Sequence, residues 1–246
     1  MKEKNTKKKR RRKKRYLLKF VLLLAFGTGI YYFISSSLFD IQKITVENNS
    51  YYTGQQVISI AEAGMGGNLF KTSTTDMKDK LLKDPYIKNA VISRKLPDEL
   101  IITVEERQEA AYVPYGDRFI IIDKEGMILR MTDVAPALTL LTGMTLTNIE
   151  TGTPLQAEEN SMLSGTLRLL AGMEENELFF KRIEFSGIVI RAYIYDNLLC
   201  EGSPENILKS MDDLKDVLYD LYVQGIERGV IRVAGDGYIS FSALVE

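Results

Sequence analysis

The side chains most often used for catalysis near neutral pH are scarce in this chain of 246 residues. Histidine is absent, which excludes Ser-His-Asp and Cys-His systems and removes the commonest zinc ligand. Cys200 is the only cysteine, so no disulfide can form within the chain, and we expect a small buried apolar residue there. No S-x-x-K, G-x-S-x-G, phosphate-loop or metal-ligand motif occurs. We therefore predict no catalytic residue, cofactor or metal.

Carboxylates could still do chemistry, because many glycosidases use a pair of acids and no histidine. The paired acids here are Glu105-Glu106 and Glu158-Glu159. Neighbours in a strand point to opposite faces, so Glu105 and Glu106 cannot share a site, and we expect both pairs to be solvated surface. A Ser-Lys dyad stays open, since spacing alone does not exclude it. The alternative function is accordingly a membrane-anchored cell-wall hydrolase that uses carboxylates.

The N-terminus predicts where the rest of the chain works. Eleven of the first fifteen residues are Lys or Arg, and an apolar stretch over 16–38 follows. A bilayer core of about 30 Å needs about 20 apolar residues in a helix, so 16–38 is predicted to span the membrane. Basic excess marks the cytoplasmic side, which leaves 1–15 inside and everything later outside. The residues expected to set this topology and to attract anionic lipid are Lys8, Lys9, Arg10, Arg11, Arg12, Lys13, Lys14 and Arg15.

Three competing roles for this N-terminus fit its residues less well. A cleavable signal has an apolar core of roughly 7 to 15 residues, whereas this one is longer and ends in Tyr31, Tyr32 and Phe33, which suit a membrane interface. No cysteine follows the apolar run at once, which argues against a lipoprotein. Nucleic acid could bind a basic run, but residues 16–246 carry 32 acidic and 21 basic residues. The exported part is therefore not built for a polyanionic partner.

The pattern after residue 39 predicts alternating strands and helices. Alternation over 41–47 indicates a strand, and Thr53 has the residue type of a helix N-cap. A second helix is expected near 74–83, followed by strands over 86–95 and 98–107. The predicted order is β-α-α-β-β over about 70 residues.

Four stretches of this part are distinctive, namely FDIQKITVENN at 39–49, GNLF at 67–70, DPYIKNAVISRKLP at 84–97 and VEER at 104–107. Through them the chain resembles a POTRA domain of the FtsQ/DivIB cell-division family. POTRA modules also occur in outer-membrane assembly proteins, but this chain has neither the room nor the alternating pattern for a long barrel. The resemblance implies a POTRA domain over 39–107.

The remainder, 108–246, resembles the β-domain that follows the POTRA module in that family. The fold class is then α+β, with one transmembrane helix, a POTRA domain and a mixed β-rich domain. Arg232 departs from the family, whose members usually have an acidic residue there. Within this domain we expect a hairpin over 119–130, a strand over 136–141, a helix over 161–171, strands over 183–185 and 188–195, one helix from the N-cap Ser203 to Gly225, and strands over 230–233 and 238–244.

The resemblance implies a non-enzymatic divisome scaffold at the division septum, linking or stabilising FtsL and FtsB/DivIC-type partners. An exposed sheet edge could bind a partner strand by β-augmentation. The terminal strand is the candidate edge, with Tyr238, Ile239 and Phe241 as anchors, although these could equally be ordinary core residues. An extracytoplasmic sensor would need a cytoplasmic signalling domain, for which residues 1–15 are too few.

Overall fold

The computed structural model describes residues 9–243, and it describes side chains from Tyr16 onward. The chain forms two compact units. The first comprises the chain up to Leu82 together with Asn89–Glu105, and the second comprises Lys83–Lys88 and the chain from Glu106. Each unit has its own sheet, so each is described by itself.

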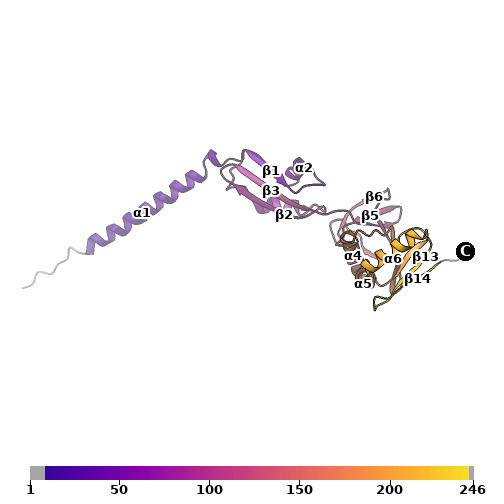
Figure 1. Cartoon of the computed structure of the whole chain (residues 1–246). Helices are drawn as coiled ribbons and strands as arrows, with labels where there is room; N and C mark the ends of the chain where they lie inside the picture. Colours follow the sequence, from indigo (N-terminus) through magenta and orange to yellow (C-terminus); the bar gives the residue numbers. More distant parts are fainter. Residues whose placement is uncertain (1–8, 244–246) are drawn as a thin grey trace, which may run out of the picture. The chain divides into compact units, whose positions relative to one another are not determined.

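Helix α1 (Lys9–Ile34) opens the first unit (Figure 1). Its segment Tyr16–Ile34 has 19 residues, a mean hydropathy of 1.9 and no burial within the protein, which fits the predicted membrane span. The helix ends at Ile34, and a single 3-10 turn, η1 (Ser37–Phe39), leads into the next domain. Lys8 lies outside the described residues, as do the side chains of 9–15.

The first unit confirms the predicted β-α-α-β-β order. Its sheet has the strand order β1-β3-β2, with β1 parallel to β3. Thr53 caps the first helix as expected: its hydroxyl accepts from the Gln56 N–H, and the Gln56 side chain accepts from the Thr53 N–H in return. The elements are β1 (Lys43–Glu47), α2 (Gly54–Ile60), α3 (Thr74–Leu81), β2 (Ile87–Lys95) and β3 (Glu99–Glu106).

The second unit is built on a sheet of nine strands within the described residues, in the order β14-β13-β12-β11-β10-β7-β4-β5-β6. Three of its junctions are parallel, namely β4 with β7, β7 with β10, and β12 with β13. The strands are β4 (Ala111–Tyr115), β5 (Arg118–Ile122), β6 (Ile128–Thr132), β7 (Thr139–Thr142), β10 (Arg182–Ser186), β11 (Val189–Tyr193), β12 (Leu198–Gly202), β13 (Gly229–Val233) and β14 (Ile239–Ser242), and β8 (Leu146–Asn148) pairs separately with β9 (Gln156–Ala157).

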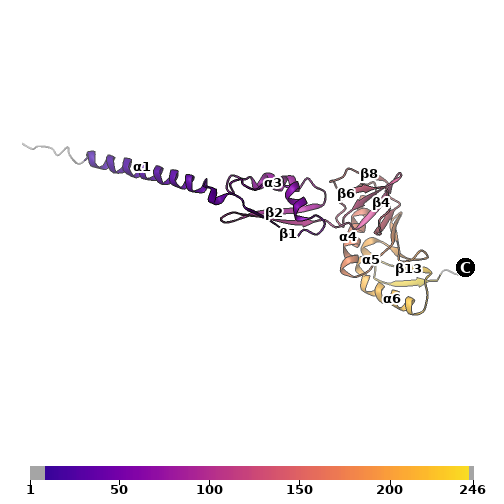
Figure 2. The same cartoon turned by 90° about the horizontal axis from the view of Figure 1, so that it is seen from above.

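Helices α4 (Asn160–Glu175), α5 (Pro204–Lys209) and α6 (Met211–Val223) gather beside this sheet (Figure 2). Their apolar side chains join one core with the strand residues that alternate toward them. Phe180 and Cys200 are fully buried in that core. The prediction for Cys200 is confirmed, and burial raises the pKa of its thiol to about 12.

Two expectations for the second unit were wrong, and several of its strands were not expected. The single helix after Ser203 is two helices, because Ser210 leaves the helical conformation with φ −103° and ψ 20°. Ile207 in α5 and Leu214 in α6 are both buried, one on each side of this break. The strand expected from Pro136 begins at Thr139. That strand is paired on both sides, where a proline could not donate to the ladder. Strand β12 was not predicted.

Candidate functional site

The predicted docking strand lies at an end of the large sheet. Among the described strands β14 pairs only with β13. A tight turn joins the two, in which Gly237 adopts φ +80° and its N–H donates to the Ala234 carbonyl at 3.1 Å. The Ala234 N–H donates to the Tyr238 carbonyl at 3.0 Å, which fixes the register of the hairpin.

This register decides which backbone groups of β14 face the open edge. Ile239 lies opposite Val233, and Phe241 lies opposite Ile231. Hydrogen-bonded and non-hydrogen-bonded pairs alternate in an antiparallel ladder. Since the pair Ala234–Tyr238 is hydrogen-bonded, Ile239 and Phe241 occupy non-hydrogen-bonded positions. Their N–H and C=O groups therefore point away from β13, toward the position an added strand would take.

The side chains of the three predicted anchors differ in their exposure. Tyr238 precedes β14 and is 67% exposed. Ile239 and Phe241 are half-buried and pack against the core. The ring of Phe241 lies against Gly229, where a Cβ would collide with it. The structure thus brings Ile239 and Phe241 to the helix-covered face, where they contribute to the core, and leaves Tyr238 accessible.

A charge ladder crosses the sheet toward the same edge. Successive cross-strand neighbours are Glu184, Arg191, Glu201, Arg232 and Ser240, so the charges alternate until the edge strand. Glu201 lies 3.5 Å from Arg191 and 3.6 Å from Arg232, measured between side-chain oxygen and Nε. In the sequence, Arg232 stands out only as a departure from the pattern of the FtsQ/DivIB family. The ladder could not be found without the strand register, because its charged members lie up to 48 positions apart.

A second polar cluster in the large unit is formed by Tyr86, Glu109 and Arg130. The Tyr86 hydroxyl donates to Glu109 at 2.6 Å, and Arg130 Nε donates to the same oxygen at 2.7 Å. Burial opposes ionisation of Glu109, but these hydrogen bonds and the Arg130 charge hold its pKa below the ordinary value. Such a carboxylate stays ionised and fixed, so it anchors the cluster and does not exchange a proton near neutral pH.

Among the described residues, the shifted carboxyl groups differ from the acid that a hydrolase would need. A general acid needs a raised pKa, whereas every described carboxyl group with a clearly shifted pKa is shifted downward. A surface hollow of about 480 Å³ includes Asp196, ion-paired with Lys181 at 2.6 Å. Another, of about 530 Å³, includes Glu125, whose pKa is lowered by Lys88 and Arg107. Among the described residues no three potential metal ligands come together.

The acid pairs noted in the sequence lie at the surface. Glu105 is exposed and Glu106 is half-buried at the end of β3. Glu158 is exposed, and Glu159 accepts a hydrogen bond from the Thr145 N–H at 3.1 Å. The geometry gives neither pair a catalytic arrangement.

The family model for the FtsQ-type POTRA domain matches residues 39–107. Cell division protein DivIB of Clostridium acetobutylicum is 29% identical over 183 residues, which is 73% of this chain and 74% of that protein. Residues 39–107 therefore match an FtsQ-type POTRA domain, and most of the chain is similar to cell-division proteins of the FtsQ/DivIB family. Cell division protein DivIB of Clostridium tetani is 23% identical over 83% of this chain and 76% of its own length. Cell division protein FtsQ of Syntrophotalea carbinolica is 25% identical over 59% of this chain and 51% of its own length.

Similarity to the FtsQ/DivIB family supports a role in cell division. It also accounts for the architecture, in which one apolar N-terminal helix precedes a POTRA domain and a β-rich part. The family model covers only the three-stranded sheet of the first unit, so the candidate edge at β14 depends on its own geometry.

Proposed function

We propose that this protein is an FtsQ/DivIB-type, non-enzymatic scaffold of the divisome that links or stabilises FtsL and FtsB/DivIC-type partners at the septum. The basic tail, Lys8–Arg15 included, keeps the N-terminus in the cytoplasm, and both folded units lie outside. Tethering scaffold and partners to one membrane raises their effective concentration, so modest pairwise affinity is sufficient.

The observation that carries the proposal is the position of β14. It is a terminal strand whose Ile239 and Phe241 backbone groups face the open edge. An extended partner segment can pair with those groups, and Tyr238 is exposed beside them as a side-chain anchor. The partner would thereby extend the nine-stranded sheet by one strand.

The decisive experiment compares Ile239→Pro with Ile239→Ala in the full chain. Proline removes the outward N–H and leaves the β13 hydrogen bonds intact, since an edge position of this kind tolerates proline. Alanine removes the same side chain and keeps the N–H. Affinity purification from dividing cells should recover FtsL and the FtsB/DivIC-type protein with Ile239→Ala, and with Ile239→Pro it should recover much less of either. Equal recovery with both variants would exclude backbone pairing at this position.

Two further variants test whether side chains of the edge strand contribute to partner binding. Tyr238→Ala should weaken partner recovery while the melting temperature stays unchanged, because Tyr238 is exposed. Phe241→Asp should also abolish recovery. However, Phe241 packs on the core, so its result counts only if circular dichroism shows a folded domain.

Cellular localisation and a peptidoglycan assay test the proposal that the protein is a non-enzymatic septal scaffold. A fluorescent fusion of the full chain should gather at mid-cell, and uniform membrane fluorescence through the cell cycle would contradict the septal assignment. The purified full chain should leave peptidoglycan intact in a zymogram. A cleared band would instead support the membrane-anchored hydrolase.

A further inference from the structure

We infer that the first unit contacts lipid directly through a membrane collar formed by Leu38, Met65 and Phe70. These side chains would lie in the interfacial region of the same bilayer that α1 crosses. The inference rests on α1 being a membrane span, and it holds whichever side of the membrane the unit occupies.

A loop of the POTRA domain is tied to the end of the apolar helix. The Asn68 side-chain amide donates to the carbonyl of Ile34 at 2.9 Å and to that of Ser36 at 3.4 Å. Asn68 also forms a β-bridge with Asp40. Because Ile34 is the last residue of the candidate span, the loop around Asn68 is held within hydrogen-bonding distance of the point where the span ends.

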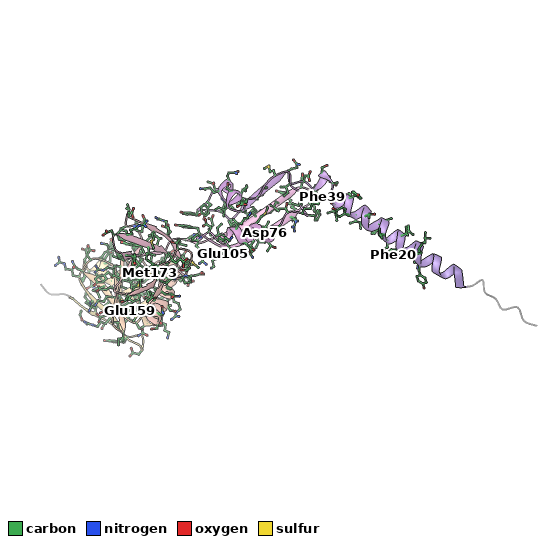
Figure 3. The ribbon with its side chains drawn as sticks, turned by 180° about the vertical axis from the view of Figure 1, so that it is seen from behind. Phe20, Phe39, Asp76, Glu105, Glu159 and Met173 are labelled. Atoms are coloured by element: carbon green, nitrogen blue, oxygen red, sulfur yellow. The ribbon has the colours of Figure 1, made fainter. Side chains whose placement is uncertain are left out.

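Aromatic packing continues the same connection. Phe33 in α1 contacts Phe39 edge-to-face at a centroid distance of 5.4 Å, and Phe39 contacts Phe70 at 5.1 Å. Phe39 is buried between them, and it lies at the junction of helix and domain in Figure 3. Edge-to-face aromatic pairs of this kind are favourable beyond their area burial. The three rings thus run without interruption from the membrane helix into the loop.

Leu38 lies in the η1 turn, and Met65 and Phe70 lie in the loop around Asn68; all three side chains are apolar and exposed. Leu38 is 54% exposed, Met65 70% and Phe70 42%. Gly66 turns the chain with φ +79°, and its N–H donates to the Ile41 carbonyl at 2.9 Å, which holds Met65 outward at the turn. Interfacial elements bury their apolar side about 5–10 Å into the boundary between headgroups and acyl chains. Residues fastened to the end of a membrane span fall within that depth.

The chemistry of the surrounding loop suits lipid better than a protein partner. Lys71 follows Phe70 and is exposed, so its stem can lie along the apolar surface while its ammonium reaches phosphate. Aromatic and basic residues are the usual membrane-interface anchors. Any protein that covered this collar would have to displace the headgroups already adjacent to Ile34.

The chain contains no tryptophan, so a single introduced tryptophan can report depth. We would place it at Met65 or Phe70 in the full chain, reconstituted into phosphatidylcholine vesicles with or without bromine near the carbonyl end of the acyl chains. Phe20→Trp, within the span, is the positive control. Val91→Trp is the matched exposed control, since Val91 is 56% exposed in the same unit. It lies three residues, or about 10 Å, along β2 from Arg94, whose Nε donates to the Leu69 carbonyl in the collar loop at 2.7 Å.

Bromine should quench Met65→Trp and Phe70→Trp far more than Val91→Trp, and their emission should be blue-shifted relative to it. Met65→Trp keeps the Phe39–Phe70 contact, so it remains informative if Phe70→Trp perturbs the loop. Quenching of both no greater than that of Val91→Trp, with Phe20→Trp quenched, would overturn the collar and leave the anchor intact. Failure to quench Phe20→Trp in vesicle-bound protein would overturn the membrane span, and the collar with it.

Discussion

The main sheets of the two units are assembled by different means. In the first unit β2 and β3 form a hairpin, and β1 joins β3 in parallel across the helices α2 and α3. In the second unit β7 lies between β4 and β10 through two parallel junctions, and two helices separate β12 from β13. The smaller sheet therefore has one hairpin and one parallel junction, beside helices with side-chain caps. The larger sheet has three parallel junctions, and its stability depends on core side chains from distant segments. We expect mutations to change the stability of the two units separately.

The largest expected difference comes from the core of the second unit. Phe180 is fully buried there, and Phe180→Ala should lower the free energy of unfolding of that unit by about 3–5 kcal/mol. Leu81→Ala is the counterpart in the first unit, where Leu81 is fully buried, with an expected loss of about 2–5 kcal/mol. Hydrogen exchange resolved by peptide would assign each loss. A loss of protection spread equally over both units would contradict the division into two cores.

Acidification should destabilise the first unit through Glu99. Glu99 receives hydrogen bonds from Lys43, Lys95 and Thr45, and these hold its pKa at about 2. Since this pKa is lowered, its stabilising contribution is complete above about pH 4.5 and is lost as the pH falls from there toward 2. Glu99→Gln should remove that part of the pH dependence, as measured by thermal denaturation at several pH values. An unchanged acid profile in the variant would show that other groups control it.

A local cap should have a moderate effect confined to the first unit. Thr53→Ala removes the capping box of α2 and should cost about 1 kcal/mol. Thr53→Ser keeps a capping hydroxyl and should restore most of that stability. Denaturant unfolding of both variants measures the difference, and equal stability of the two would exclude a capping role.

The smallest effect is expected from the charge ladder in the second unit. The Glu201–Arg232 pair is partly exposed and 3.6 Å apart, so a double-mutant cycle of Glu201→Gln and Arg232→Gln should give a coupling of only about 0.2–1 kcal/mol. The coupling should shrink in high salt. A larger coupling that does not change with salt would mean that the charge ladder stabilises the second unit as much as the helix caps stabilise the first.

The sequence predicted the first unit well because its signals are local. The Thr53 side chain caps α2 by accepting from the N–H of Gln56, only three residues ahead. The turn at 96–98 joins two strands that are neighbours in the sequence. The same reasoning located the hairpin of β5 and β6 and the pair of β13 and β14. It also predicted that Cys200 is buried, from composition alone.

The sequence was less informative where pairing is distant. Strand β12 received no separate signal, because its position depends on a parallel junction with β13 across α5 and α6. The break at Ser210 interrupts a continuous apolar stripe that favours one helix, and only the packing of both segments on the core reveals it. For the candidate site, the edge strand was predictable. The outward backbone of Ile239 and the charge ladder ending at Arg232 required the register.

The position of β14 in chain order affects how the protein is made. The strand is synthesised after all eight other strands of its sheet, and the membrane helix and the POTRA domain are made long before it. A polypeptide that stops before Ile239 would therefore be inserted into the membrane with a complete first unit, yet it would lack the edge proposed for partner binding. Under that proposal, incomplete products could occupy the membrane without sequestering division partners.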